Sequence, residues 1–252
     1  MKTVRLDEME QYILENSTVT MQDLCTRFEV SISTVRQDVG ELVQKGAVKK
    51  IYGGVSSARA NQLVPFDERK ARNFKCKQAI GKQAVTLLRD RDIVFLDSGT
   101  TTMQLIPHIP PSIRVTVLTH SLSAMQAAVP YDHVELICLP GKLDRRTNAF
   151  LTADLRYLEQ YNITIAMMAV TGISPSGDVT NSSLLEHEIK RMAVEKSDRA
   201  YLLADSEKFD RASLITYARL DQFTGLVTDN DLSSSAARLC SEMGIDLQIA
   251  EV

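Results

Sequence analysis

The sequence of 252 residues has no tryptophan, only four histidines and only four cysteines. The cysteines lie far apart and form no Cys-x-x-Cys pair: Cys25, Cys76, Cys138 and Cys240. This spacing favours reduced thiols, and the scarcity of histidine argues against a metal site, so we expect neither metal nor cofactor. No apolar run reaches the ~18 residues of a membrane span, and no apolar segment follows Lys2 as in a secretion signal. We therefore expect a cytoplasmic protein without a membrane partner.

The sequence also lacks a large excess of charge of either sign, because its formal net charge is −3. Such a value disfavours a nonspecific nucleic-acid binder. The charge is unevenly spread, however, since residues 31–77 carry ten basic and four acidic side chains. Residues 1–30 carry three basic and six acidic side chains, and residues 78–252 carry 16 basic and 22 acidic ones. The basic stretch is where a phosphate backbone would be met, although a solvated linker explains the basic residues of 69–77 equally well.

Residues 20–55 show the pattern of two short helices followed by a hairpin. Thr20 and Asp23 match a capping box that opens the first helix. Residues 29–31 predict a turn, after which Ser31 or Ser33 can cap the second helix. In that helix an apolar stripe recurs at i, i+4, i+7 and i+8, as expected of a buried face: Val35, Val39, Leu42 and Val43. Beyond Gly46, residues 47–55 predict a hairpin, and residues 3–15 predict a helix that precedes the pair.

The face opposite the apolar stripe carries short hydroxyls, amides and one arginine rather than the usual glutamates and lysines. Such groups suit base edges and phosphates. The segment therefore predicts a helix that reads duplex DNA, with a hairpin wing beside it; the alternative is a three-helix module that binds protein. The predicted DNA contacts are Ser33, Thr34, Arg36, Gln37, Lys45, Lys49, Lys50 and Tyr52.

After residue 76 short apolar strands alternate with helices, which predicts an α/β domain with a mostly parallel sheet covered on both faces. The expected strands are 93–96, 115–118, 134–139, 163–170, 200–204, 226–228 and 247–249. The expected helices are 79–88, one starting near 103, 122–128, 184–195 and 233–243. The domains are thus a DNA-binding domain at 3–58 (reading segment 20–39, wing 47–56), a linker at 59–75, and an effector-binding and oligomerisation domain at 76–252.

The sharpest chemical signal in the second domain is the segment 97–102, of sequence Asp-Ser-Gly-Thr-Thr-Thr, between a strand and a helix. Backbone N–H groups, hydroxyls and a glycine at such a turn form a cradle that suits a phosphate; a hydroxyl-rich helix cap is the alternative. We expect Asp97 and His120 to face a sugar and Lys208 to pair with the phosphate. The predicted effector contacts, all at strand ends, are Asp97, Ser98, Gly99, Thr100, Thr101, Thr102, His120, Ser121, Gly141 and Lys208.

These motifs resemble those of DeoR-type bacterial transcriptional regulators. In the first domain the resemblance rests on residues 31–38, Leu42, residues 45–46 and residues 51–54, with departures at Gln37, where a second arginine is common, and Tyr52, where histidine is common. In the second domain the matching positions are residues 97–102, 119–121, Gly141, Thr180, Lys190 and 205–209. His120, where asparagine is usual, and residues 151–152, where a glycine is common, depart from the pattern.

The resemblance implies a winged helix-turn-helix followed by a sensor domain whose fold is similar to that of ribose-5-phosphate isomerase and glucosamine-6-phosphate deaminase. It further implies a repressor of a sugar-metabolism operon, released from double-stranded operator DNA by a phosphorylated sugar. Because one small head neutralises few phosphates, we expect a homodimer or homotetramer. The alternative is a sugar-phosphate isomerase or deaminase with an appended DNA-binding head. It is disfavoured because residues 171–176 lack the Asp-Gly-His turn of the deaminases.

Overall fold

The computed structural model describes residues 2–16, 18–51, 54–57 and 64–252. The chain divides between Leu63 and Val64 into two compact units, an N-terminal and a C-terminal one. Within these described ranges no helix is both long and apolar enough to cross a membrane.

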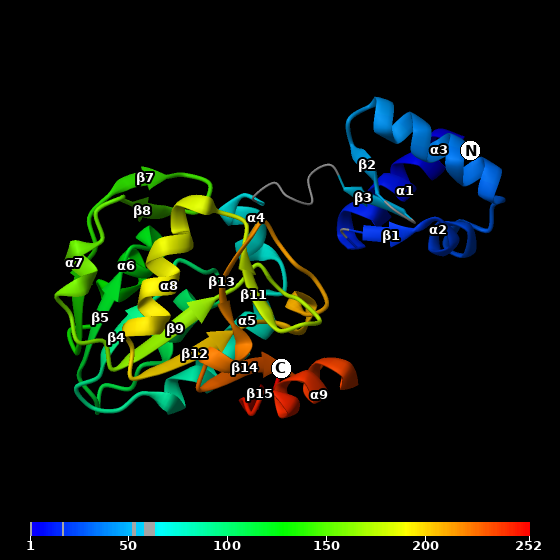
Figure 1. The fold of residues 1–252 in the computed structure, drawn as a ribbon. Helices are drawn as coiled ribbons and strands as arrows, with labels where there is room; N and C mark the ends of the chain where they lie inside the picture. The colour runs from blue at the N-terminus through cyan, green and yellow to red at the C-terminus, as the bar shows by residue number, and fades with distance from the viewer. Residues whose placement is uncertain (1, 17, 52–53, 58–63) are drawn as a thin grey trace. The chain divides into compact units, whose positions relative to one another are not determined.

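The N-terminal unit is a small three-helix domain with a three-stranded sheet (Figure 1). Its elements are α1 (Lys2–Asn16), β1 (Thr18–Thr20), α2 (Met21–Phe28), α3 (Ile32–Gln44), β2 (Val48–Ile51) and β3 (Gly54–Ser57). The strands are antiparallel in the order β1-β3-β2. The predicted apolar stripe of α3 is buried against α1, α2 and the sheet, in a core of Leu6, Met9, Ile13, Val19, Leu24, Val35, Val39, Leu42, Val48 and Val55.

The helix ends follow the local rules that the sequence indicates. The Thr20 hydroxyl accepts the Asp23 N–H at 3.0 Å and the Asp23 carboxylate accepts the Thr20 N–H at 3.0 Å, so the capping box is confirmed. At α3 the cap is Ser31 rather than Ser33, because the Ser31 hydroxyl accepts the Thr34 N–H at 3.3 Å. Glu29 ends α2 in the left-handed region with φ 52°. These caps fix the turn that presents α3.

A buried ion pair fixes α3 against α1. Asp38 on α3 is 1% exposed, and its Oδ2 accepts a bond from Arg5 Nε at 2.8 Å, while Oδ1 accepts one from Arg5 Nη2 at 3.3 Å. We expect Asp38→Ala to lower the free energy of opening of α3 by about 1.5–3 kcal/mol, because a charged hydrogen-bonded pair is lost. Amide hydrogen exchange of α3 in the full chain measures this free energy. Asp7→Ala, which removes an exposed carboxylate from α1, is the control, and equal effects of the two substitutions would contradict the assignment.

The C-terminal unit is built on seven parallel strands in the order β15-β14-β12-β9-β4-β5-β6. They are β4 (Ile93–Leu96), β5 (Val115–Thr119), β6 (Val134–Cys138), β9 (Ile165–Ala169), β12 (Arg199–Leu203), β14 (Gly225–Asp229) and β15 (Asp246–Ala250). The chain runs outward from β4 to β6, returns to β9 beside β4, and then runs outward in the other direction. The strand order therefore reverses between β4 and β9, and ligand sites of open α/β sheets form beyond the carboxyl ends at such a point.

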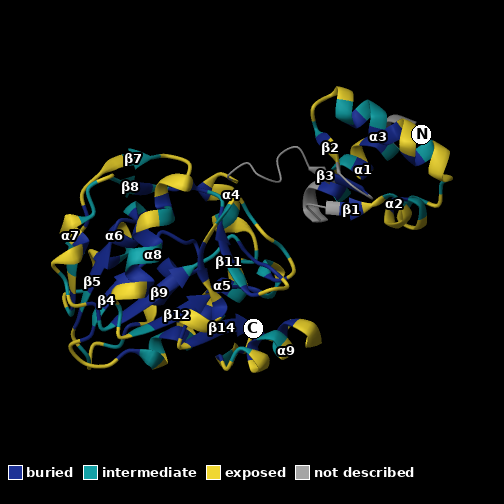
Figure 2. Cartoon of the chain, viewed as in Figure 1, coloured by how far each residue is buried: buried dark blue, intermediate teal, exposed yellow. Residues whose placement is uncertain are grey.

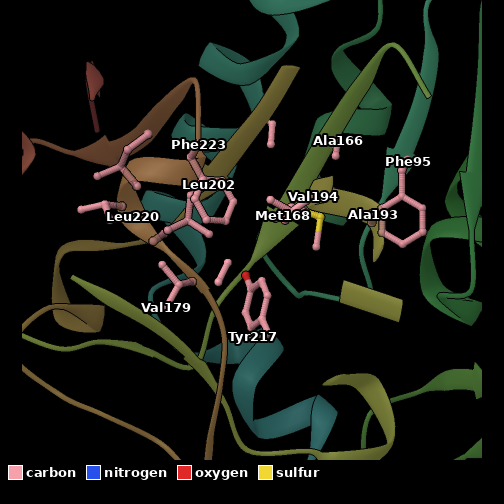
Figure 3. Packing of buried hydrophobic residues seen from close by; sticks show 14 of the residues in the cluster. Phe95, Ala166, Met168, Val179, Ala193, Val194, Leu202, Tyr217, Leu220 and Phe223 are labelled. Atoms are coloured by element: carbon pink, nitrogen blue, oxygen red, sulfur yellow. The ribbon is translucent and has the colours of Figure 1, made fainter. Parts of the chain in front are cut away.

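Helices cover both faces of this sheet, as predicted. One face packs on α8 (His187–Lys196) and α9 (Ser234–Glu242), in a cluster that contains Phe95, Met168 and Leu202 (Figure 3). The other face packs on α5 (Phe74–Ala84), α6 (Leu122–Ala128) and the 3-10 helix η2 (Thr102–His108). Neighbouring residues of a strand thus enter opposite cores, and Figure 2 shows the central strands buried.

The remaining elements were not predicted from the sequence, except that residues 85–87 and 184–186 fall within the predicted helices 79–88 and 184–195. A small antiparallel sheet contains β10 (Gly172–Ile173), β11 (Asp178–Asn181) and β13 (Ile215–Arg219), and a hairpin contains β7 (Lys142–Asp144) and β8 (Ala149–Leu151). The short helices are α4 (Phe66–Ala71), η1 (Val85–Leu87), α7 (Arg156–Glu159), η3 (Leu184–Glu186), η4 (Ser206–Lys208) and η5 (Leu220–Gln222).

The linker prediction of 59–75 needs a correction at its carboxyl-terminal part. Residues 64–75 belong to the C-terminal unit, because Phe66 of α4 is 4% exposed and packs in the same core as α5. Helix α5 also begins five residues before the predicted 79. Charged residues surround Phe66 in the sequence, so the composition of this segment did not reveal that Phe66 is buried. Residues 58–63 lie outside the described part of the chain.

Candidate functional site

The predicted reading face of α3 is accessible. Ser33, Arg36 and Gln37 are exposed and Thr34 is half-buried. The Ser33 and Thr34 hydroxyls both contact the Ser31 hydroxyl, at 2.7 and 2.9 Å, so the start of the helix carries a cluster of hydroxyl groups. Because α3 is held by its buried face, these polar groups stand on a rigid element, as direct contact with base edges requires.

The predicted basic contacts lie at the end of α3 and on β2. Lys45, Lys49 and Lys50 are all exposed. Lys49 and Lys50 are consecutive residues of a strand, so their side chains leave opposite faces of the hairpin. Tyr52, the remaining predicted contact, lies outside the described residues.

In the C-terminal unit Asp97 joins β4 to β9 at the point where the strand order reverses. Its Oδ2 accepts the Ala169 N–H at 2.8 Å and forms an ion pair with Lys190 of α8. Its Oδ1 accepts the Ser98 N–H at 2.8 Å. Burial alone would raise the pKa of Asp97, but Lys190 and these hydrogen bonds hold it below its ordinary value. Both carboxylate oxygens therefore have protein partners, and the structure gives Asp97 a positioning role beside the expected contact with a sugar.

The loop that follows Asp97 uses most of its hydroxyls internally. Ser98 donates to Glu186 Oε1 at 2.5 Å, and Thr102 donates to the carbonyls of Asp97 and Gly99 at 2.7 and 2.9 Å. In contrast, no acceptor within the described residues contacts the N–H groups of Gly99, Thr100 or Thr101. The predicted cradle for an anion thus consists of backbone N–H groups more than of hydroxyls.

Gly99 is required by the protein itself. A Cβ at this position would lie 2.2 Å from the Cβ of Ala169, so a side chain there would collide with β9 rather than project toward a ligand. The close approach that the sequence indicated is therefore between the loop after β4 and the end of β9.

His120, at the end of β5, has an unusual environment. It is 0% exposed, stacks on Phe95 with ring centroids 5.9 Å apart, and within the described chain neither ring nitrogen has a hydrogen-bond partner. Its Nε2 lies 3.9 Å from Asp97 Oδ1 and 4.0 Å from Glu186 Oε1. Burial lowers the pKa of His120 against the opposing effect of these two carboxylates. The ring is therefore neutral at pH 7 and can serve as a donor or acceptor for a bound polar group.

The buried state of His120 makes stability depend on pH. Because its folded pKa lies below the unfolded value of about 6.5, the unfolded chain binds the proton first, and stability falls as pH drops below that value by about 1.4 kcal/mol per unit until the folded pKa is reached. We expect His120→Asn to flatten this dependence, as measured by urea unfolding at pH 7.5 and 5.5. His108→Asn at an exposed site should leave it unchanged. An unaltered slope in His120→Asn would refute the assignment.

The strand end after β12 carries both acidic and basic side chains. Lys208 of η4 is half-buried, and burial lowers its pKa against the effect of the neighbouring Asp205. Asp205 is 1% exposed, and its Oδ1 accepts a bond from Asn73 at 3.5 Å. Burial likewise lowers the pKa of Arg211. Lys208 and Arg211 are thus the two cations of this segment, with Asp205 and Glu207 among their charged neighbours.

Two predicted residues have other roles in the structure. The Ser121 hydroxyl caps α6 by accepting the Ala124 N–H at 3.2 Å. Gly141 packs on β8, where a Cβ would lie 2.6 Å from the Leu151 nitrogen, and no contact with the loop 98–102 is described for it. Glu186, which bonds Ser98 and Asn181 (3.1 Å), was not predicted, although its spacing of four from Lys190 places both on one helical side.

A separate groove lies apart from the predicted site residues. A groove of ≈ 820 Å³ lies along the β7–β8 hairpin and α7 and contains none of the predicted site residues. No cluster of three or more metal-ligating side chains is found in the part of the chain that the structure describes.

Family models match both units. Residues 5–61 match the DeoR-like helix-turn-helix domain, and residues 72–230 match the DeoR C terminal sensor domain. The structure is also similar to ribose 5-phosphate isomerase A from Methanocaldococcus jannaschii, with a TM-score of 0.42 and 17% identity, over 54% of this chain and 55% of that one.

Curated relatives match over nearly the whole chain. The HTH-type transcriptional regulator IolR of Bacillus subtilis is 40% identical over 99% of this chain and 100% of its own length. The L-fucose operon activator of Haemophilus influenzae is 29% identical over 93% of this chain and 95% of its own length. The lactose phosphotransferase system repressor of Staphylococcus epidermidis is 29% identical over 90% and 92%. All three are named as regulators rather than enzymes, so the isomerase or deaminase alternative is set aside. The chain belongs to the DeoR family of helix-turn-helix transcriptional regulators.

Proposed function

We propose that the protein represses a sugar-metabolism operon and leaves its operator when a phosphorylated sugar binds the C-terminal unit. The observation that carries the proposal is the group of unused N–H donors at residues 99–101, beside the buried and unpartnered His120. Two of the relatives are named for L-fucose and lactose systems, which supports a sugar as the regulated nutrient.

In the proposed complex the phosphate accepts hydrogen bonds from the N–H groups of Gly99, Thr100 and Thr101, with Lys208 as a nearby cation. The sugar then extends toward His120, whose ring nitrogens and the adjacent Glu186 contact its hydroxyls. Carboxylates close to the phosphate would repel it, which is why Asp97 and Glu186 are assigned to the sugar side. A neutral His120 suits this role, because one ring nitrogen can accept a hydrogen bond from a sugar hydroxyl and the other can donate one to a second hydroxyl.

We further propose that the DNA-bound form is a homodimer or homotetramer. A single head offers few cations to the phosphate backbone, so tight binding at cellular salt requires two or more heads held together. Light scattering at concentrations that saturate the operator measures the mass directly, and a monomer there would contradict this part of the proposal.

A melting-temperature screen tests the effector proposal. We expect at least one of glucose 6-phosphate, fructose 6-phosphate and ribose 5-phosphate to stabilise the protein, by about 2.7 kcal/mol at one hundred times its Kd. The unphosphorylated sugars serve as controls and should have little effect. Equal stabilisation by the free sugars would show that the phosphate is not recognised.

A further inference from the structure

Helix α4 brings the backbone of Arg69 against the loop that follows Asp97. The carbonyl of Arg69 accepts a bond from the Thr100 hydroxyl at 3.4 Å. It also accepts one from the buried Lys77, which donates to the carbonyl of Arg72 at 2.6 Å as well. Lys77 therefore holds the end of α4 in place beside residues 98–102.

Among the residues that the structure describes, the guanidinium of Arg69 has no paired carboxylate. Its Nε donates to the carbonyl of Val64 at 3.1 Å, and the group lies over the Phe66 ring, 5.5 Å from the centroid. No carboxylate of the described residues lies within 4.0 Å of it, whereas Arg72 in the next turn pairs with Glu207 at 2.8 Å. Burial lowers the pKa of Arg69, while the charges of Glu186 and Asp97 act in the opposite direction. A partly desolvated cation without a paired anion is unfavourable.

Other cations add to this imbalance. Burial and the nearby Lys208 lower the pKa of Lys77 to about 8, and the charges of Arg69 and Arg72 act in the same direction. Asp205 offsets part of this repulsion, because its charge raises the pKa of Lys77 and of Lys208, and Glu207 is already paired with Arg72. A dianion bound here would relieve the repulsion among the cations.

We propose that Arg69 is an effector-binding residue whose guanidinium holds the phosphate together with the N–H groups of residues 99–101. This inference rests on the proposed function. In it, Arg69 rather than Lys208 is the main side chain that contacts the phosphate. Arginine suits the task because its planar fork forms two parallel bonds with a phosphate. Arg69 belongs to the segment that directly follows residues 58–63. The proposed phosphate contact thus lies in the part of the C-terminal unit that comes first after the DNA-binding domain in the chain.

The test compares Arg69→Gln with Arg72→Gln, which removes the same charge three residues away from a group that is already paired. Melting temperatures are measured against inorganic phosphate and the three sugar phosphates. Arg69→Gln should weaken binding by about 10–150-fold, the value of a charged hydrogen-bonded contact. Arg72→Gln should weaken it by less than about fivefold, as for an exposed pair. The ligand-free Arg69→Gln protein should melt no lower than the wild type, because a repulsive charge has been removed.

The outcomes separate this inference from the proposed function. If the wild type responds to a sugar phosphate and Arg69→Gln responds with the same affinity, the role of Arg69 is refuted and the proposed function stands. If neither inorganic phosphate nor any sugar phosphate stabilises the wild type, both fail. If Arg69→Gln lowers the melting temperature of the free protein, Arg69→Lys decides, since it keeps the charge and loses the fork. Undiminished phosphate affinity in Arg69→Lys then overturns the inference.

Discussion

Replacing Lys190 by methionine is expected to lower the free energy of unfolding of the C-terminal unit by about 3–5 kcal/mol. Lys190 is 2% exposed and Asp97 is 0% exposed, so the substitution leaves a buried carboxylate without its cation. The effect exceeds that of a surface pair because water cannot replace the lost partner. Urea unfolding at pH 7 measures the loss, and Lys82→Met at an exposed position of α5 is the control.

The pH dependence of Lys190→Met provides a second readout. In the wild type the folded pKa of Asp97 is depressed, so the stability it contributes is present above the unfolded pKa of about 3.9 and is lost as pH falls through the folded pKa. Without Lys190, burial raises this pKa, and acidification from neutral pH should then reduce the difference in stability between the wild type and the variant, since both retain the effect of His120. Adding Asp97→Asn should recover part of the loss by removing the buried charge. A loss of less than about 1 kcal/mol in Lys190→Met, the value of an exposed pair, would contradict the role of this ion pair.

Replacing Arg36 by alanine is expected to reduce affinity for the operator by about 1–3 kcal/mol and to relax discrimination at one base pair. The reason is its position on the exposed face of α3, where a guanidinium can pair with a guanine. Selection from a randomised duplex library, followed by anisotropy titrations, measures both effects.

Lys50→Ala is the matched control for Arg36→Ala, because it removes one positive charge from the exposed wing. It should weaken binding to all DNA sequences alike. It should also reduce the magnitude of the slope of log K against log salt by about 0.9, the value for one phosphate contact. If Arg36→Ala behaves in the same way, with no change in the selected sequence, Arg36 contacts phosphate and not a base.

The sequence was most informative where structure is determined locally. The capping box at Thr20 involves contacts within a few residues, and the stripe along α3 is a local periodicity of the sequence; both are confirmed. The alternation of strands and helices predicted the parallel sheet and thereby placed the loop after Asp97 at its carboxyl edge. Where a helix starting near 103 was expected, the structure has the short 3-10 helix η2, and Pro107 inside it donates no backbone N–H that could extend an α-helix.

Contacts between distant parts of the chain could not be derived in this way. Asp97 and Lys190 are 93 residues apart in sequence, and only the family resemblance marked Lys190. Arg69 stands in a charged stretch whose composition fits a solvated linker equally well. Its position depends on the packing of Phe66 and on the bonds from Lys77 and Thr100, and both of these residues come after α4 in the chain. The strands β10, β11 and β13 are short and come from separated segments, so no local pattern revealed their pairing.

The measurement that tests the account most directly is the affinity for selected operator DNA with and without the sugar phosphate that stabilises the protein. A typical allosteric coupling of about 1–3 kcal/mol predicts that the ligand weakens DNA binding roughly 5–150-fold, and that DNA weakens ligand binding by the same factor. An unchanged DNA affinity at saturating ligand would contradict coupling between the two units, and a tighter complex would contradict repression released by the effector.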